Sequence, residues 1–84
     1  MNLGYDFSLV GEAARSVMAV SPGRRRKAML VIEALAADPF LEPDLEEHGP
    51  SGRRYSILLR ENILITYWVD HAVKELRILQ IEFD

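Results

Sequence analysis

Residues 53–84 read RRYSILLRENILITYWVDHAVKELRILQIEFD, and this run decides the fold class. In Arg53–Arg60 and again in Lys74–Phe83, side chains alternate with a period of two, which predicts strands with two different faces. The middle run, Ile63–Val69, is apolar on both faces, as expected for a strand inside a sheet. Short polar segments that predict tight turns separate the three runs: Glu61-Asn62 and Asp70-His71-Ala72. The C-terminal part is therefore predicted to be a three-stranded meander.

The N-terminal half predicts one strand and two helices. Residues Leu3–Leu9 alternate and predict a half-buried strand, whereas Gly11–Val20 has helical spacing. Ser21-Pro22 predicts a break and a new helix start, because serine can cap free N–H groups and proline fits the first helical position. The second helix is expected from Gly23 or Arg24 to about Ala37, ending before Asp38-Pro39.

Residues 38–52 contain three prolines and two glycines and predict a loop, with at most one short turn at Asp44–Glu47. The expected order is β-α-α-β-β-β in a single domain, residues 1–84. Two helices followed by a meander predict an α+β fold, an antiparallel sheet with the helical hairpin packed on one face.

Composition restricts the function. Apolar residues make up 49% of the chain, there is no cysteine, and the net charge of −3 argues against a protein that coats nucleic acid. No apolar run approaches the roughly 20 residues of a membrane span, so a cytoplasmic protein is expected. No pair of histidines or carboxylates has helical spacing suited to a metal, and no phosphate loop is present, so neither metal nor cofactor is expected.

Several segments resemble the RelE/ParE toxin superfamily, which includes plasmid-stabilisation proteins. Leu35-Ala36-Ala37-Asp38-Pro39-Phe40 is similar to the end of that family's second helix, and Gly49–Tyr55 to its turn into the next strand. Asn62–Asp70 is similar to a strand of ParE-type members, and Lys74–Leu79 to their last strand. Together with the element order, the resemblance covers nearly the whole chain and is closer to the ParE type.

The resemblance implies the toxin subunit of a type II toxin–antitoxin module, neutralised by a protein antitoxin and acting on DNA gyrase or on translation. An mRNA endonuclease on the ribosome needs cations around the reacting phosphate. At the positions that match the family's cations this chain has Ser56, Leu58 and Leu64, so enzymatic activity is left open. The alternative is a non-toxic family member that acts as an oligomeric or partner-binding module.

The remaining cations give candidate binding residues. We expect target binding by basic side chains that project from the sheet opposite the helices, with Tyr67 as a donor: Arg53, Arg54, Arg60, Tyr67 and Arg77. The run Arg24-Arg25-Arg26-Lys27 opposes the dipole of its own helix. It indicates either a solvated helix end, compensated by acidic residues of the following loop, or an electrostatic contact with an acidic antitoxin tail or with nucleic acid. We therefore expect the antitoxin at Arg24, Arg25 and Met29, and a homodimer through the same helix is the alternative.

Overall fold

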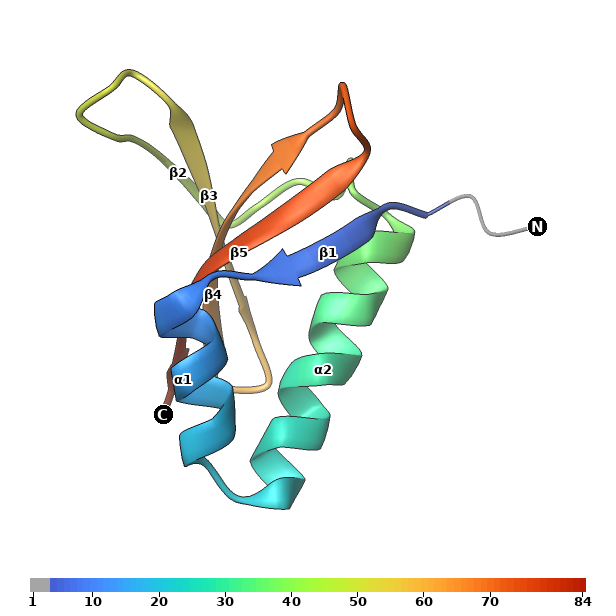
Figure 1. The fold of residues 1–84 in the computed structure, drawn as a ribbon, viewed down its shortest axis with the longest axis vertical. Coiled ribbons are helices and arrows are strands. Elements are labelled where there is room, and N and C mark those ends of the chain that lie inside the picture. The colour runs from blue at the N-terminus through green and yellow to red at the C-terminus, as the bar shows by residue number, and fades with distance from the viewer. Residues whose placement is uncertain (1–3) are drawn as a thin grey trace.

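The computed structural model describes residues 4–84. Its elements are β1 (Asp6–Leu9), α1 (Gly11–Ala19), α2 (Pro22–Ala37), β2 (Leu45–His48), β3 (Arg54–Arg60), β4 (Ile63–Asp70) and β5 (Glu75–Phe83). The strands form one sheet in the order β1-β5-β4-β3-β2 (Figure 1). The predicted α+β class, both helices and the C-terminal meander are confirmed. Leu3, with which we began the first strand, lies outside the described residues.

Two details of the expected sheet are wrong. Residues 45–48 were predicted to be loop, but they form the edge strand β2, antiparallel to β3. All four side chains of β2 are exposed. The sequence of β2 therefore lacks the alternation of apolar and polar residues that predicts a half-buried strand. The sheet is also mixed rather than antiparallel, because β1 pairs in parallel with β5.

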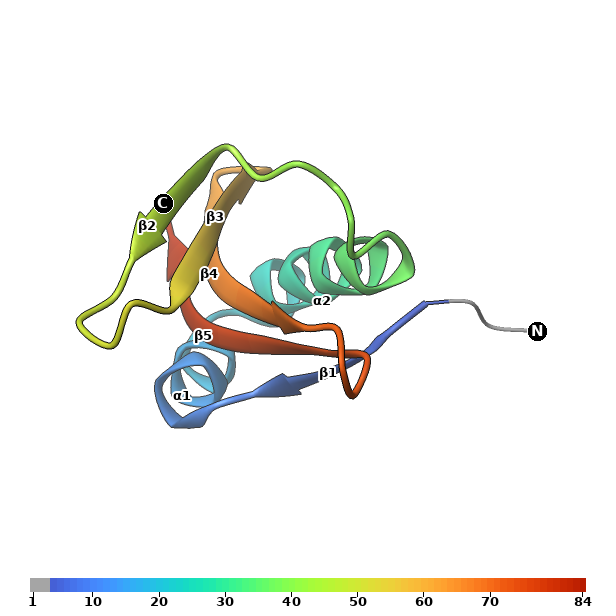
Figure 2. The ribbon, with the colours of Figure 1, turned by 90° about the horizontal axis from the view of Figure 1, so that it is seen from above.

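The core lies on one face of the sheet only. Both helices contribute small or branched residues to it, among them Ala13 and Val17 of α1 and Ile32 and Leu35 of α2. They meet a layer of strand residues that are at most 3% exposed: Leu58, Ile63, Ile65, Tyr67, Leu76, Ile78 and Ile81. We call this side of the sheet the covered face. Figure 1 shows both helices below the upper part of the sheet, and in Figure 2 α2 lies within its curve.

The opposite side, which we call the open face, has no helix on it in the part of the chain described. Because cross-strand partners share a face, the register assigns Leu59 with Leu64, and Trp68 with Arg77, to this side. Leu45 and Ile57 are also partners there. A sheet with one face packed and one face free is the usual arrangement of an antiparallel meander.

Arg25 connects the two helices. Its guanidinium donates hydrogen bonds to three carbonyl oxygens at the end of α1 and just beyond, those of Val17 (3.1 Å), Met18 (3.3 Å) and Val20 (3.2 Å). The last carbonyls of a helix have no partner within the helix, and a cation there is also favoured by the helix dipole. Ser21 caps the start of α2 as expected, accepting from the Arg24 amide at 3.4 Å.

The turn between β3 and β4 is a two-residue connection, since Arg60 pairs with Ile63. Glu61 and Asn62 both have positive φ, 55° and 62°. This combination is the hairpin turn whose twist matches that of the strands, and it favours asparagine and glycine. Glutamate is a poor residue for the first position, because its Cβ is crowded in the left-handed conformation.

No helix within residues 4–84 is both long enough and apolar enough to cross a lipid bilayer.

Replacing Glu61 by asparagine should stabilise the fold. Asparagine tolerates the left-handed conformation better, so we expect Glu61→Asn to raise the free energy of unfolding by about 0.5–1 kcal/mol. Urea unfolding followed by circular dichroism measures this change. Glu61→Val should have the opposite effect, and equal stability of the two variants would contradict the assigned turn.

Replacing Arg25 by alanine should destabilise the helical hairpin. Three carbonyls lose their donor, and we expect a loss of about 1–2 kcal/mol in the free energy of unfolding. Arg26→Ala is the matched control, since Arg26 is exposed and makes none of these bonds. If the two variants unfold at the same urea concentration, the helix-capping role of Arg25 is wrong.

Candidate functional site

An apolar groove runs between α2 and β3 on the covered side of the sheet. It has a volume of about 540 Å³. Its walls are mainly apolar side chains: Leu30, Val31, Ala34, Leu35, Leu41 and Leu58. Leu30 is 59% exposed there, which is unusual for a leucine in the middle of a helix whose other face is packed. Lys27 and Arg60 add positive charge at the rim, with Asp38 and Glu61 as the acidic members.

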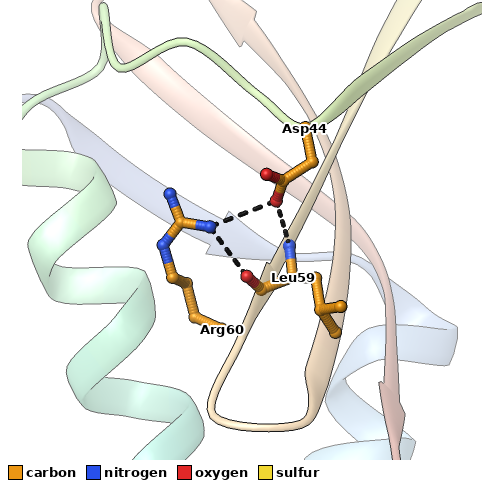
Figure 3. Close-up of polar contacts among 3 residues, drawn as sticks. All are labelled: Asp44, Leu59 and Arg60. Atoms are coloured by element: carbon orange, nitrogen blue, oxygen red, sulfur yellow. Dashed lines mark hydrogen bonds and ion pairs between the residues drawn. The ribbon is translucent and has the colours of Figure 1, made fainter.

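One wall of the α2–β3 groove is fixed by a polar contact (Figure 3). The carboxylate of Asp44 accepts a hydrogen bond from the Leu59 amide at 2.7 Å and one from the Arg60 guanidinium at 3.1 Å. Arg60 donates in addition to the carbonyl of Leu59 at 2.7 Å. The segment that enters β2 is thereby attached to the end of β3. Arg60 is a structural residue in this arrangement, in addition to the binding role predicted for it.

The candidate antitoxin residues have different surroundings. Arg24 is exposed and lines, with Lys27, a smaller hollow beside the β3–β4 turn and Asp84. Arg25 is engaged with the end of α1, as described above. Met29 is half-buried against the core. Of the three, only Arg24 is an exposed cation without a described hydrogen bond from its side chain. Leu30 and Val31, which follow Met29 in α2, line the groove but were not predicted as binding residues.

The five candidate target-binding residues do not converge on one surface. Arg54 and Arg60 lie on the covered side, and Tyr67 is buried there. Arg53 and Arg77 lie on the open face. The expectation that all these cations project away from the helices is therefore wrong for Arg54 and Arg60. Their side chains are 64% and 44% exposed, so both reach solvent on the same side as the core.

Arg53 and Arg77 meet over one side chain on the open face. The guanidinium carbon of Arg53 lies 4.2 Å from the centroid of the Trp68 ring, and that of Arg77 lies 5.4 Å from it. Both distances are in the range of cation–π attraction. Glu75 comes within 3.3 Å of Arg77 Nε, but this buried nitrogen has no hydrogen bond. The sequence predicted that Trp68 and Tyr67 point to opposite faces of their strand, but it did not predict the contact of Trp68 with these two arginines.

A second, more polar groove of about 720 Å³ lies beneath residues 39–43 on the covered side. Its lining includes Arg54, Ser56, Tyr67 and His71. Arg54 forms an exposed ion pair with Glu46 at 3.5 Å. Burial raises the pKa of the Tyr67 phenol, and nearby Asp44 and Glu46 add to this effect against the opposing influence of Ser56 and Arg60. Tyr67 is therefore a neutral hydrogen-bonding group and a poor proton donor at physiological pH.

An aromatic cluster closes one end of this second groove. The Tyr5 hydroxyl is hydrogen-bonded to Nδ1 of His71 at 3.0 Å, and the ring of Phe40 stacks on His71 with centroids 5.0 Å apart. Phe40 is nevertheless 73% exposed. The cluster attaches the segment after α2 to the β4–β5 turn and to the start of the chain.

The positions that match the family's catalytic cations hold no charge in this fold. Leu58 is buried in the core, Ser56 lies on the covered face, and Leu64 is half-buried on the open face. Stabilising a phosphate that becomes doubly charged requires fixed cations close to it. The open face has an apolar surface around Leu64 instead. No group of three metal-ligating side chains occurs within residues 4–84.

Comparisons with known proteins give a fold and no sequence family. No protein-family model matches the chain, and no curated protein sequence matches it either. Among solved structures, it is similar to a chain of the archaeal RelE–RelB complex from Pyrococcus horikoshii OT3. That alignment has a TM-score of 0.74 at 12% identity and covers 95% of this chain and 94% of the other.

A second similar structure is the toxin–antitoxin complex RelBE2 from Mycobacterium tuberculosis. The TM-score is 0.68 at 18% identity, with coverage of 98% of this chain and 100% of that chain. The likeness extends over the full length of both chains, and the sequence-based expectation of a RelE-like fold is confirmed. This chain has the α+β fold of the RelE-type proteins found in these two complexes.

Proposed function

We propose that this chain is the toxin subunit of a type II toxin–antitoxin module, neutralised by a protein antitoxin in the cytoplasm. The observation that carries the proposal is the α2–β3 groove in a fold that is shared with chains of two toxin–antitoxin complexes. An apolar groove beside a helix is the kind of surface that takes the apolar side of a partner helix. Exposed Leu30 and the rim cation Lys27, with Arg24 in the neighbouring hollow, suit an amphipathic helix with acidic flanks.

For the cellular target we propose DNA gyrase in preference to messenger RNA. The absence of charge at Ser56, Leu58 and Leu64 supports this choice, since cleavage of RNA without a metal depends on cations at the reacting phosphate. The neutral, buried Tyr67 supports it as well, because it is a poor acid for the leaving group. An apolar side chain in place of a cation at Leu64, which is half-buried on the open face, is suited to a protein target.

Expression of the chain alone should arrest bacterial growth. In extracts we expect purified protein to inhibit gyrase supercoiling and to leave ribosome-bound mRNA intact. Primer extension on a translated message is the assay for cleavage, and a plasmid supercoiling gel is the assay for gyrase. Cleavage at defined codons would replace gyrase by the ribosome as the target. Harmless accumulation at high level would overturn the toxin proposal and favour a partner-binding module.

Charge at Leu30 should abolish neutralisation. We expect Leu30→Glu to weaken binding of the proposed protein antitoxin by about 100-fold, because a carboxylate would be buried in an apolar interface. Isothermal titration calorimetry measures the affinity, and co-expression measures rescue of growth.

The control is Met18→Glu, which changes a similarly exposed apolar residue on α1, 71% exposed and outside the groove. It should bind the partner normally. Equal loss of affinity in both variants would show that the α2–β3 groove is not the contact.

A further inference from the structure

The open face carries a patch of apolar side chains on the side of the sheet away from the α2–β3 groove. Leu45 of β2 is 61% exposed, and Leu59 of β3 is 53% exposed. Leu45 is paired with Ile57 and Leu59 with Leu64, so the four side chains lie together on three adjacent strands. We call them the leucine patch. Exposed leucines grouped on one face of a sheet mark an interaction site.

Two carboxylates without an ion pair flank the leucine patch. Glu82 is the cross-strand partner of Leu64 on one side, and Glu47 follows Leu45 by two residues on the other. Both are exposed, and neither forms an ion pair with any residue between positions 4 and 84. A carboxylate beside apolar surface is available to a cation of a partner that covers this surface.

The two arginines of the open face do not balance these carboxylates. Arg77 is already paired with Glu75, and both guanidinium groups lie over the ring of Trp68, not over the leucine patch. Asp70 is the cross-strand partner of Glu75 and adds a further acid. The face thus has more carboxylates than guanidinium groups. Such a surface repels nucleic acid and acidic segments and attracts a basic ligand.

A second copy of the chain is a poor occupant for the same reason. It would bring the same excess of acid to the contact, and like charges brought together across an interface oppose association. A ligand with both apolar side chains and cations matches the leucine patch and its flanking carboxylates together.

We propose that the open face binds a basic amphipathic segment of a partner protein, with apolar side chains on the leucine patch and one cation on each of Glu47 and Glu82. These two residues are three strand spacings apart across the sheet. Along β3, their neighbours Tyr55 and Leu59 are four residues apart. Together these offsets correspond to about 20 Å, the length of about seven extended residues. The α2–β3 groove lies on the other side of the sheet, so the inference does not rest on the antitoxin proposal.

A short peptide tests this site, and Trp68 reports its binding. Trp68 is the single tryptophan of the chain and lies on the same face as the leucine patch. The probe is the peptide Lys-Ser-Leu-Ser-Leu-Ser-Lys with blocked ends, whose lysines and leucines share one side when the peptide is extended. We expect a saturable change in Trp68 emission. The same peptide with glutamates in place of the lysines should give no such change.

Matched variants locate the contact. Leu59→Ser should raise the Kd of the lysine peptide about tenfold, because one buried leucine contact is lost. The double variant Glu47→Gln and Glu82→Gln should also raise it about tenfold, since two exposed ion pairs are lost. The controls are Met18→Ser and Glu33→Gln, which make the same kinds of change at exposed positions on the helices and should leave the Kd unchanged.

Several outcomes overturn the inference. One is the absence of a fluorescence response, and another is equal affinity for the glutamate peptide. Equal weakening by the control variants would place the peptide elsewhere on the molecule. If sedimentation shows a dimer of the chain that Leu59→Ser dissociates, the face is covered by a second copy. The Leu30→Glu result is independent of all four, so failure here is distinguishable from failure of the antitoxin proposal.

Discussion

The structure depends on one apolar layer between the helices and the covered face of the sheet. Ile32 of α2, Ile65 of β4 and Ile78 of β5 are fully buried in it. Within the described residues, two short helices cover only one side of the five-stranded sheet. The open face and the groove beside α2 both follow from this limit. The surfaces that we assign to partners are apolar surfaces that neither helix covers.

The arginines divide into those that hold the fold together and those that remain available. Arg25 caps the end of α1, and Arg60 is held by Asp44 and by the carbonyl of Leu59. The bond of Arg25 joins the two helices, and the bond of Arg60 to Asp44 joins β3 to the segment before β2. Arg53 and Arg77 lie against the ring of Trp68, and Arg77 is also paired with Glu75. Cation count in the sequence therefore overstates the binding capacity of this protein.

The sequence predicted the helices and strands in which apolar residues recur at a regular spacing. Both helices, the Ser21 cap, the Glu61-Asn62 turn and the opposite orientation of Tyr67 and Trp68 could be derived from spacing and turn chemistry. Strand β2 could not, because none of its side chains is buried and it is held by backbone pairing and by Asp44. The parallel pairing of β1 with β5 joins opposite ends of the chain, which no local pattern reports.

The candidate site was predicted less well than the fold, for a physical reason. Which cations come together depends on register, and a bulge between Thr66 and Tyr67 shifts the pairing of β4 with β5. Trp68 is opposite Arg77 only after this shift, so residue spacing alone could not identify the pair. The same applies to Arg25, whose partners lie on the preceding helix and not on its own.

The exposed strand β2 has a consequence for solubility. It ends the sheet with four residues, of which Glu46 and Glu47 are adjacent acids. A row of free amides and carbonyls at a sheet border can recruit further chains into aggregates, and like charges on such a short border oppose that stacking. At the other border, β1 is equally short and passes directly into a helix. Both borders of the sheet are thus short, and at β2 the acidic side chains oppose the addition of a further strand.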